Sequence, residues 1–196
     1  MIYKATITSA SLRLRESRII ADLLLRGVGD ADWKAAVLEK NLLQMRSPES
    51  IRRVAGLLRA RIEPLGRDLW KLVRDGDREQ ATQATLAGAV KNSRLLGDFM
   101  DLALREQRSL FAKQLNASVW SDYIAGCRGR DPDMPHWSDA TVARLRSAVF
   151  SMLAEAGYLE NTRSLLLQNV FVDVELATYL RDRDETYVLR CLEVAE

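Results

Sequence analysis

The stretch HWSDATVARLRSAVFSMLAEAGYLE, from His136 to Glu160, carries the clearest helix signal in the chain. Ser138 is a favourable N-cap residue, because its hydroxyl can accept a hydrogen bond from a free backbone N–H of the first turn. Gly157 can adopt a positive φ and is suited to end the helix. Apolar residues at helical spacing predict one buried face: Val142, Leu145, Val149, Met152, Leu153 and Ala156. The helix either only packs in a core or also presents its arginines to nucleic acid.

Helical signals continue on both sides of this stretch. Ser47 followed by Pro48 predicts a helix start, since a cap precedes proline at the first helical position. Two short extended segments are expected, an arm from Ile2 to Thr8 and a stretch around residues 162–172. We therefore expect a mostly all-α protein with little β structure, built as a compact multi-helix bundle. Residues 1–130 are expected to form an N-terminal helical bundle, packed as one unit with a helix-turn-helix-like part over residues 131–196.

Composition places the chain among soluble proteins. Its 196 residues, 47% of them hydrophobic, suit one domain or two small ones. No run approaches the 18 to 20 apolar residues, roughly, that span a bilayer, and the start lacks the apolar core of a signal peptide. Cys127 and Cys191 lie far apart in sequence and are expected to be reduced. We expect a cytoplasmic protein with no membrane partner.

Charge is unevenly distributed along the chain. Residues 1–74 hold 15 Lys and Arg against 8 Asp and Glu, whereas residues 75–196 hold 14 against 19. Only 6 of the 29 basic residues are lysine, which leaves 23 arginines. Arginine binds phosphate and guanine through two parallel N–H groups, so the bias indicates an anionic partner. A GC-rich coding sequence would produce the same composition without any such partner.

The residues needed for common catalytic sites are missing. His136 is the one histidine, and with two distant cysteines it cannot complete an ordinary zinc site. A Ser-His-Asp or Cys-His site would have to use His136, with no nucleophile motif to support it. The sequence also has no Gly-x-x-x-x-Gly-Lys-Ser/Thr phosphate loop. We expect a non-enzymatic protein without a metal or a cofactor.

The order helix, loop, helix and extended segment, from Ser118 to Val172, suits a winged helix-turn-helix. In that class the second helix enters the major groove and its early residues meet base edges. The candidate DNA contacts are Thr141 and Arg144 at the bases, Arg146 at a flank, Arg163 on the wing, and Arg128 and Arg130 from the preceding loop. Nearby acids, Asp131, Asp133 and Asp139, would repel phosphate. The alternative is a helix that packs on both sides and binds nothing.

A second basic surface is expected on the helix that follows Ser47. Its candidate contacts are Arg52, Arg53 and Arg59, which should face outward when Ile51, Val54 and Leu58 face the core. An ordinary solvated helix face would show the same pattern. The two candidate surfaces are not exclusive.

Four segments together resemble a known family. They are SASLRLRESRIIADLLLRG (9–27), NLLQMRSPESIRRVAGLLRARI (41–62), NSRLLGDFM (92–100) and WSDATVARLRSAVFSMLAEAGYL (137–159). Their order is similar to that in BrxA proteins of BREX bacteriophage-exclusion systems, over about Thr8 to Leu180. The resemblance implies a non-enzymatic, NusB-like helical fold associated with DNA binding. It also implies a defence island with a methyltransferase, an ATPase and a phosphatase-like protein.

These observations together predict a DNA-binding component of a phage-defence system. Duplex DNA would be held mainly by arginine–phosphate contacts, so affinity should fall steeply with salt. Other BREX proteins are expected partners. One alternative is an adaptor that binds only a protein of the defence complex, through an exposed apolar patch. The other is an RNA-binding module, which the NusB likeness suggests.

Overall fold

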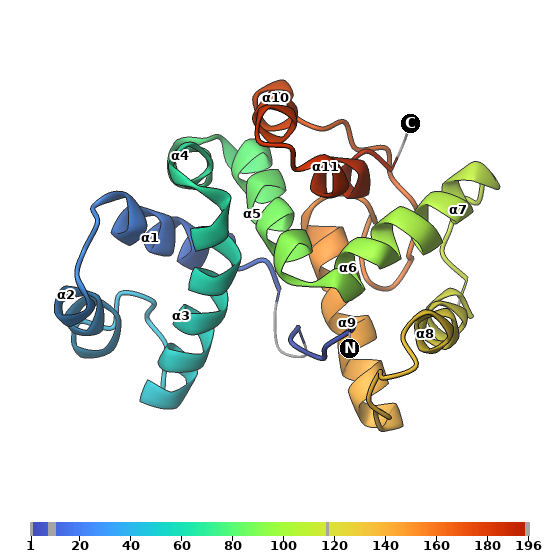
Figure 1. The fold of residues 1–196 in the computed structure, drawn as a ribbon, viewed down its shortest axis with the longest axis horizontal. Coiled ribbons are helices and arrows are strands. Elements are labelled where there is room, and N and C mark those ends of the chain that lie inside the picture. Colours follow the sequence, from blue (N-terminus) through green and yellow to red (C-terminus); the bar gives the residue numbers. More distant parts are fainter. Residues whose placement is uncertain (1, 8–10, 117, 195–196) are drawn as a thin grey trace. The chain divides into compact units, whose positions relative to one another are not determined.

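The computed structural model describes residues 2–7, 11–116 and 118–194, and its regular structure is helical (Figure 1). The described residues include no named strand, only two isolated β-bridges, Gln114 with Leu166 and Leu159 with Leu167. The all-α prediction is confirmed. Contacts divide the chain into two compact units, Leu12–Asn92 and the combination of the N-terminal segment with residues 93–194. We call them the 12–92 unit and the 93–194 unit. The division expected after residue 130 would fall at the end of a helix inside the second.

The 12–92 unit is built around one small-residue helix. Its elements are α1 (Leu14–Leu25), α2 (Asp30–Lys34), π-helical η1 (Ala35–Glu39), α3 (Pro48–Ile62), 3-10 η2 (Glu63–Leu65), α4 (Arg67–Asp75) and α5 (Arg78–Asn92). The helix α5 contacts α1, α3 and α4, and its buried residues are mostly Ala, Thr and Gly. A Cβ on Gly88 would lie 2.6 Å from the carbonyl oxygen of Arg61. The close crossing of α3 and α5 therefore requires glycine.

The predicted start of α3 is confirmed. Ser47 is extended at the N-cap and its hydroxyl accepts a hydrogen bond from the backbone N–H of Ser50 at 3.2 Å. Pro48 occupies the first helical position, where its missing N–H has no partner to lose. The helix buries Ile51, Val54 and Leu58 as expected. Arg52 and Arg53 consequently face solvent.

The 93–194 unit holds the helix of the opening stretch. Its elements are α6 (Arg94–Asp98), π-helical η3 (Phe99–Leu104), α7 (Arg105–Ser109), α8 (Val119–Arg130), α9 (Asp139–Glu155), α10 (Val174–Asp182) and α11 (Thr186–Leu192). An aromatic cluster joins η3, α8 and α9. Phe99 packs against Trp120 and Tyr123 at centroid distances of 5.3 and 5.2 Å, and against Phe150 at 5.8 Å. Such rings contribute both buried area and preferred geometry to a core.

Two buried carboxylates join distant parts of this unit. Asp98 accepts hydrogen bonds from the hydroxyls of Tyr3 and Tyr187, each at 2.8 Å, and is paired with Arg94 at 2.9 Å. Asp98 is 4% exposed, and these partners supply the hydrogen bonds that a carboxyl group needs in a core. The Asp101 carboxylate pairs with Arg190 of α11, through the Nε and Nη2 atoms of the arginine. The two carboxylates therefore connect the N-terminal segment and α11 to the α6 and η3 helices.

The structure confirms most of what the sequence predicts for α9. The Ser138 hydroxyl accepts from the backbone N–H of Thr141 at 3.3 Å, and Gly157 has a φ of +82°. Five of the six predicted apolar residues are buried, while Val142 is half-buried. Ala148 and Phe150 are buried as well. Among the described ranges, no helix is long and apolar enough to cross a bilayer.

Candidate nucleic-acid interface

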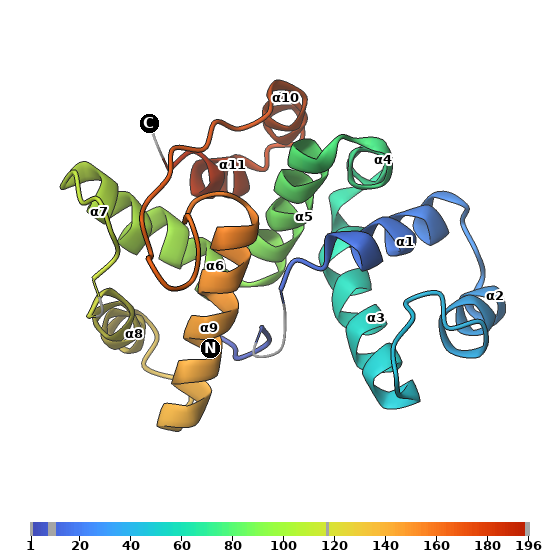
Figure 2. The ribbon, with the colours of Figure 1, turned by 180° about the vertical axis from the view of Figure 1, so that it is seen from behind.

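Three short segments pair beside α9. The backbone N–H of Leu115 donates to the carbonyl of Leu165 at 3.0 Å, and that of Leu167 donates to Lys113 at 2.9 Å. On the other side, Glu160 donates to Leu166 at 2.9 Å and Gln168 donates to Tyr158 at 3.0 Å. Residues 165–168 therefore lie between residues 113–115 and residues 158–160, and both bridges are antiparallel. Figure 2 shows the chain leaving α9 in a wide loop before it reaches α10.

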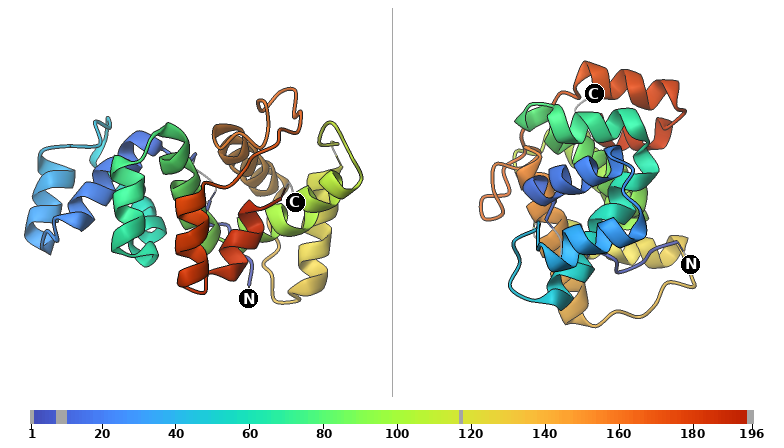
Figure 3. Two further views of the ribbon diagram at one scale, coloured as in Figure 1. Left: turned by 90° about the horizontal axis from the view of Figure 1, so that it is seen from above. Right: turned by 90° about the vertical axis from the view of Figure 1, so that its left-hand side faces the viewer.

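A tight turn closes this arrangement at residues 161–164. The Asn161 side chain accepts hydrogen bonds from the backbone N–H groups of Arg163 and Ser164, both at 2.8 Å. An Asn side chain that bonds backbone two and three residues later fixes a turn. Arg163 lies at the exposed tip, and its guanidinium makes no hydrogen bond or ion pair with a described residue. Figure 3 shows the segment after α9 as a projecting loop.

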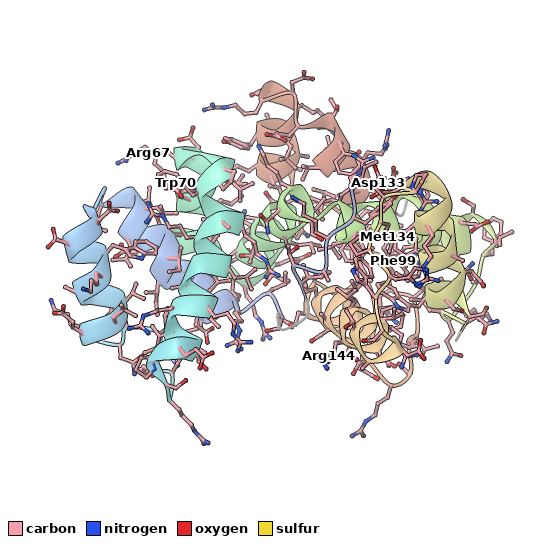
Figure 4. All side chains as sticks on the ribbon, turned by 60° about the horizontal axis from the view of Figure 1, so that its bottom comes forward. Arg67, Trp70, Phe99, Asp133, Met134 and Arg144 are labelled. Carbon is pink, nitrogen blue, oxygen red and sulfur yellow. The ribbon has the colours of Figure 1, made fainter. Side chains whose placement is uncertain are left out.

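The outer side of α9 lies between two arginines. Arg144 and Arg146 are exposed, and neither side chain forms a hydrogen bond or an ion pair with a described residue. Since consecutive residues differ by about 100°, the two arginines are about 160° apart across the exposed side. Ala143 and Ser147 lie between them and are exposed. Figure 4 shows Arg144 on the outside of α9. The small side chains of Ala143 and Ser147 allow a partner to approach the helix backbone closely, although the exposed Asp139 begins the helix in the same arc.

A hollow of about 440 Å³ lies between α9 and the turn. Its lining residues are Arg146, Ser147, Phe150, Ser151, Thr162 and Leu165. None of the lining residues is acidic, and most carry a hydroxyl or a guanidinium group. The helical pattern places Ser147 and Ser151 on the exposed side, but no sequence signal places Thr162 or the 113–115 segment beside α9.

Arg130 is exposed at the end of α8, but its guanidinium is already bound within the 93–194 unit. Its Nε donates to the Tyr3 hydroxyl at 2.9 Å and its Nη2 donates to the Cys127 sulfur at 3.4 Å. The guanidinium also lies 5.7 Å from the centre of the Tyr123 ring. Arg130 is therefore held by the N-terminal segment and α8. Arg128 is exposed as well, but its side chain has no hydrogen bond or ion pair with a described residue.

The acids near α9 have different environments. Asp131 is 4% exposed, and its carboxylate accepts a hydrogen bond from the backbone N–H of Tyr3 at 3.1 Å and another from Ile2. Burial alone would raise the pKa of Asp131, but these N–H groups outweigh it and lower the pKa. Asp133 and Asp139 are exposed. Asp131 thus anchors the N-terminal segment and is withdrawn from the surface.

The three arginines of the second candidate surface also differ. Arg52 and Arg53 are exposed, and their side chains make no hydrogen bond or ion pair with a described residue. Arg59 binds Glu63 through Nε and Nη2, both at 3.1 Å, and stacks on Trp33 at 4.6 Å from the ring centre. Arg59 is therefore already engaged within the 12–92 unit. This surface and α9 belong to different units.

The titratable groups of the described residues give no metal site. No group of three or more His, Cys, Asp or Glu side chains gathers within these ranges. Both cysteines are buried and free. Burial raises the pKa of the Cys191 thiol to about 12 and also raises that of Cys127. Neither thiol is suited to act as a nucleophile at neutral pH.

The fold and the site thus describe a small all-helical protein whose unpartnered arginines border one helix and one turn. The family model for BrxA matches residues 1–184. The BREX protein BrxA of Paramagnetospirillum magneticum is 45% identical over 98% of this chain and 97% of its own length. That of Escherichia coli O9:H4 is 28% identical, over 93% and 85%. A crystal structure of an uncharacterized protein from Magnetospirillum magneticum has a TM-score of 0.92 and 43% identity, and covers 99% of this chain and all of its own.

The chain belongs to the BrxA family, and it is a component of the BREX type of phage-defence system. The family resemblance of the four segments is confirmed.

Proposed function

We propose that this protein is a cytoplasmic, non-enzymatic component of its defence system that binds duplex DNA through α9 and the turn at residues 161–164. The observation that carries the proposal is the exposed side of α9. Two arginines without hydrogen-bond partners among the described residues border a strip of small residues there. A helix with such a strip fits the major groove, while flanking arginines reach phosphates on either side.

The order of elements supports this placement. A helix ends at Ser109, and then come the paired segment 113–115, α8, α9 and the two paired segments around the turn. This is the order of a winged helix-turn-helix, in which the last helix before the wing is the recognition helix. Thr141 would meet a base edge, Arg144 would contact a phosphate and the adjacent base edge, and Arg146 would contact a phosphate on the other flank. Arg163 would reach the backbone from the wing.

The hollow between α9 and the turn supports a contact with the DNA backbone. A duplex bound along α9 brings one phosphodiester strand across this hollow, where Arg146, Ser147 and Thr162 would face it. The absence of acidic lining residues favours a negatively charged occupant. Arg128 would add a contact from the end of α8. Arg130 is not part of this proposal, because its hydrogen bonds already hold the N-terminal segment.

The test is fluorescence anisotropy on a labelled 30-base-pair duplex, titrated with the full chain over a series of salt concentrations. We expect saturable binding whose affinity falls steeply with salt. A structured RNA at matched salt serves as competitor, and stronger competition by RNA than by duplex DNA would favour the RNA-binding alternative. The proposal is wrong if folded protein binds neither nucleic acid at low salt.

A further inference from the structure

A second hollow lies in the 12–92 unit, away from α9 in sequence. It has a volume of about 330 Å³ and lies between the α2–η1 segment and α3. Val37, Leu38, Ala55 and Gly56 form an apolar floor. We call this feature the α3 groove. A single large apolar side chain, or two, would fill such a volume.

The α3 groove exists because the surrounding packing is incomplete. No residue of α2 is fully buried, and its half-buried Trp33 has the guanidinium of Arg59 at 4.6 Å from its ring centre. Gly56 lies on the exposed side of α3, and a Cβ built there would have no heavy atom within 4 Å. Glycine in a helix interior costs about 1 kcal/mol relative to alanine. The open space above Gly56 is therefore a place that no side chain of this unit fills.

The rim of the groove is basic. Lys34 and Arg52 line it, and neither side chain makes a hydrogen bond or an ion pair with a described residue. Arg59 also lines it but is paired with Glu63. No acidic residue lines the groove, although Asp30 and Asp32 belong to α2. An occupant with carboxylates beside Lys34 and Arg52 would form an ion pair with each of these side chains.

We propose that the α3 groove binds an acidic amphipathic helix of a partner protein. The apolar face of such a helix would place large side chains over Gly56 and against Trp33, at the i and i+3 or i+4 spacing typical of helix-in-groove recognition. Its flanking Asp or Glu residues would meet Lys34 and Arg52. An extended peptide is disfavoured, because the groove is formed by helices and offers no free strand edge.

The apolar floor favours a protein partner over a nucleic acid. A duplex would contact the rim cations through its phosphates, but phosphates and sugars would leave Leu38 and the open side of Gly56 uncovered. A partner helix buries both the floor and the charges. The proposal therefore assigns Arg52 to protein binding, independently of the proposed contact between α9 and DNA.

The test uses a display library of 16-residue helical peptides with randomised surface positions, selected on the immobilised full chain. Gly56→Leu fills the groove and serves for counter-selection. It should fold, because its side chain extends into open space, and circular dichroism checks this. Ala60→Leu is the matched control, since Ala60 is exposed on the same helix but does not line the groove.

Selection should enrich peptides that carry large apolar residues at i and i+3 or i+4 and more acidic than basic residues. A synthetic copy of an enriched peptide should lose about tenfold or more in affinity on Gly56→Leu. Lys34→Glu with Arg52→Glu should weaken it about three- to tenfold, and Ala60→Leu should leave it unchanged.

The proposal is overturned if no peptide is enriched, or if enriched peptides are basic or bind Gly56→Leu as well as the parent. It is also overturned if Lys34→Glu with Arg52→Glu weakens binding to duplex DNA while no enriched peptide distinguishes the parent from Gly56→Leu. The groove rim would then be a nucleic-acid surface.

Discussion

Replacing Arg144 and Arg146 together by alanine should weaken binding to duplex DNA without unfolding the protein. Both side chains are exposed and have no hydrogen bond or ion pair with a described residue, so the core loses nothing. Each exposed arginine–phosphate contact contributes about 1 kcal/mol, and two contacts correspond to roughly a 30-fold loss of affinity. Each lost phosphate contact should also reduce the slope of log affinity against log salt by about 0.9. The double variant should therefore lower that slope by about 1.8.

The assay is anisotropy on a labelled duplex, with the parent and the variant measured over the same series of salt concentrations. Arg26→Ala with Lys40→Ala is the matched control, because it removes two exposed positive charges from the 12–92 unit. Its affinity should change less than that of the α9 variant. If the α9 variant keeps the parent's affinity and salt slope while the parent binds well, the assignment of the contact to α9 is refuted.

Three further predictions concern the framework that holds α9. Asp98→Ala should destabilise the protein by about 2–4 kcal/mol, because two tyrosine hydroxyls lose a common acceptor; urea unfolding measures this, and an unchanged midpoint would contradict it. The ionised Asp131 carboxylate, whose folded pKa is lowered, should stabilise the fold above pH 4, roughly, and lose that contribution as pH falls through the folded pKa. Asp131→Asn should then show a smaller drop in urea midpoint between pH 7 and pH 3, and a drop equal to the parent's would exclude this role. Gly157→Ala should cost about 1 kcal/mol, since Gly157 has a φ of +82°, and a melting temperature within 1 °C of the parent, roughly, would argue against it.

Local signals in the sequence were sufficient to predict α9 and the start of α3. The Ser138 and Ser47 caps, Pro48 and Gly157 act through neighbouring backbone groups, so their effects can be anticipated without knowledge of the fold. The apolar spacing of α9 likewise predicts its buried face. The same spacing cannot reveal that Phe150 is buried against Phe99, because that contact depends on how η3 and α9 pack.

The candidate site was only partly predictable for the same reason. Charge and helical periodicity place Arg144 and Arg146 on the surface, and the structure agrees. Arg130 is likewise a charged residue that the sequence places at the surface, but its guanidinium binds Tyr3, which is 127 positions away. The α3 groove depends on the small residues Ala55 and Gly56 meeting η1. Long-range contacts of these kinds leave no local pattern in a single sequence.

The most direct test of the central claim is site-specific photo-crosslinking from α9 to DNA. Ser147→Cys places an exposed thiol between Arg144 and Arg146, and the two native cysteines are buried. The thiol carries a photoreactive group, and Ala60→Cys on α3 serves as the matched control. We predict efficient crosslinking to a duplex from position 147 and little from position 60. Crosslinking from position 60 alone, or from neither position under conditions where the duplex is bound, would contradict the account.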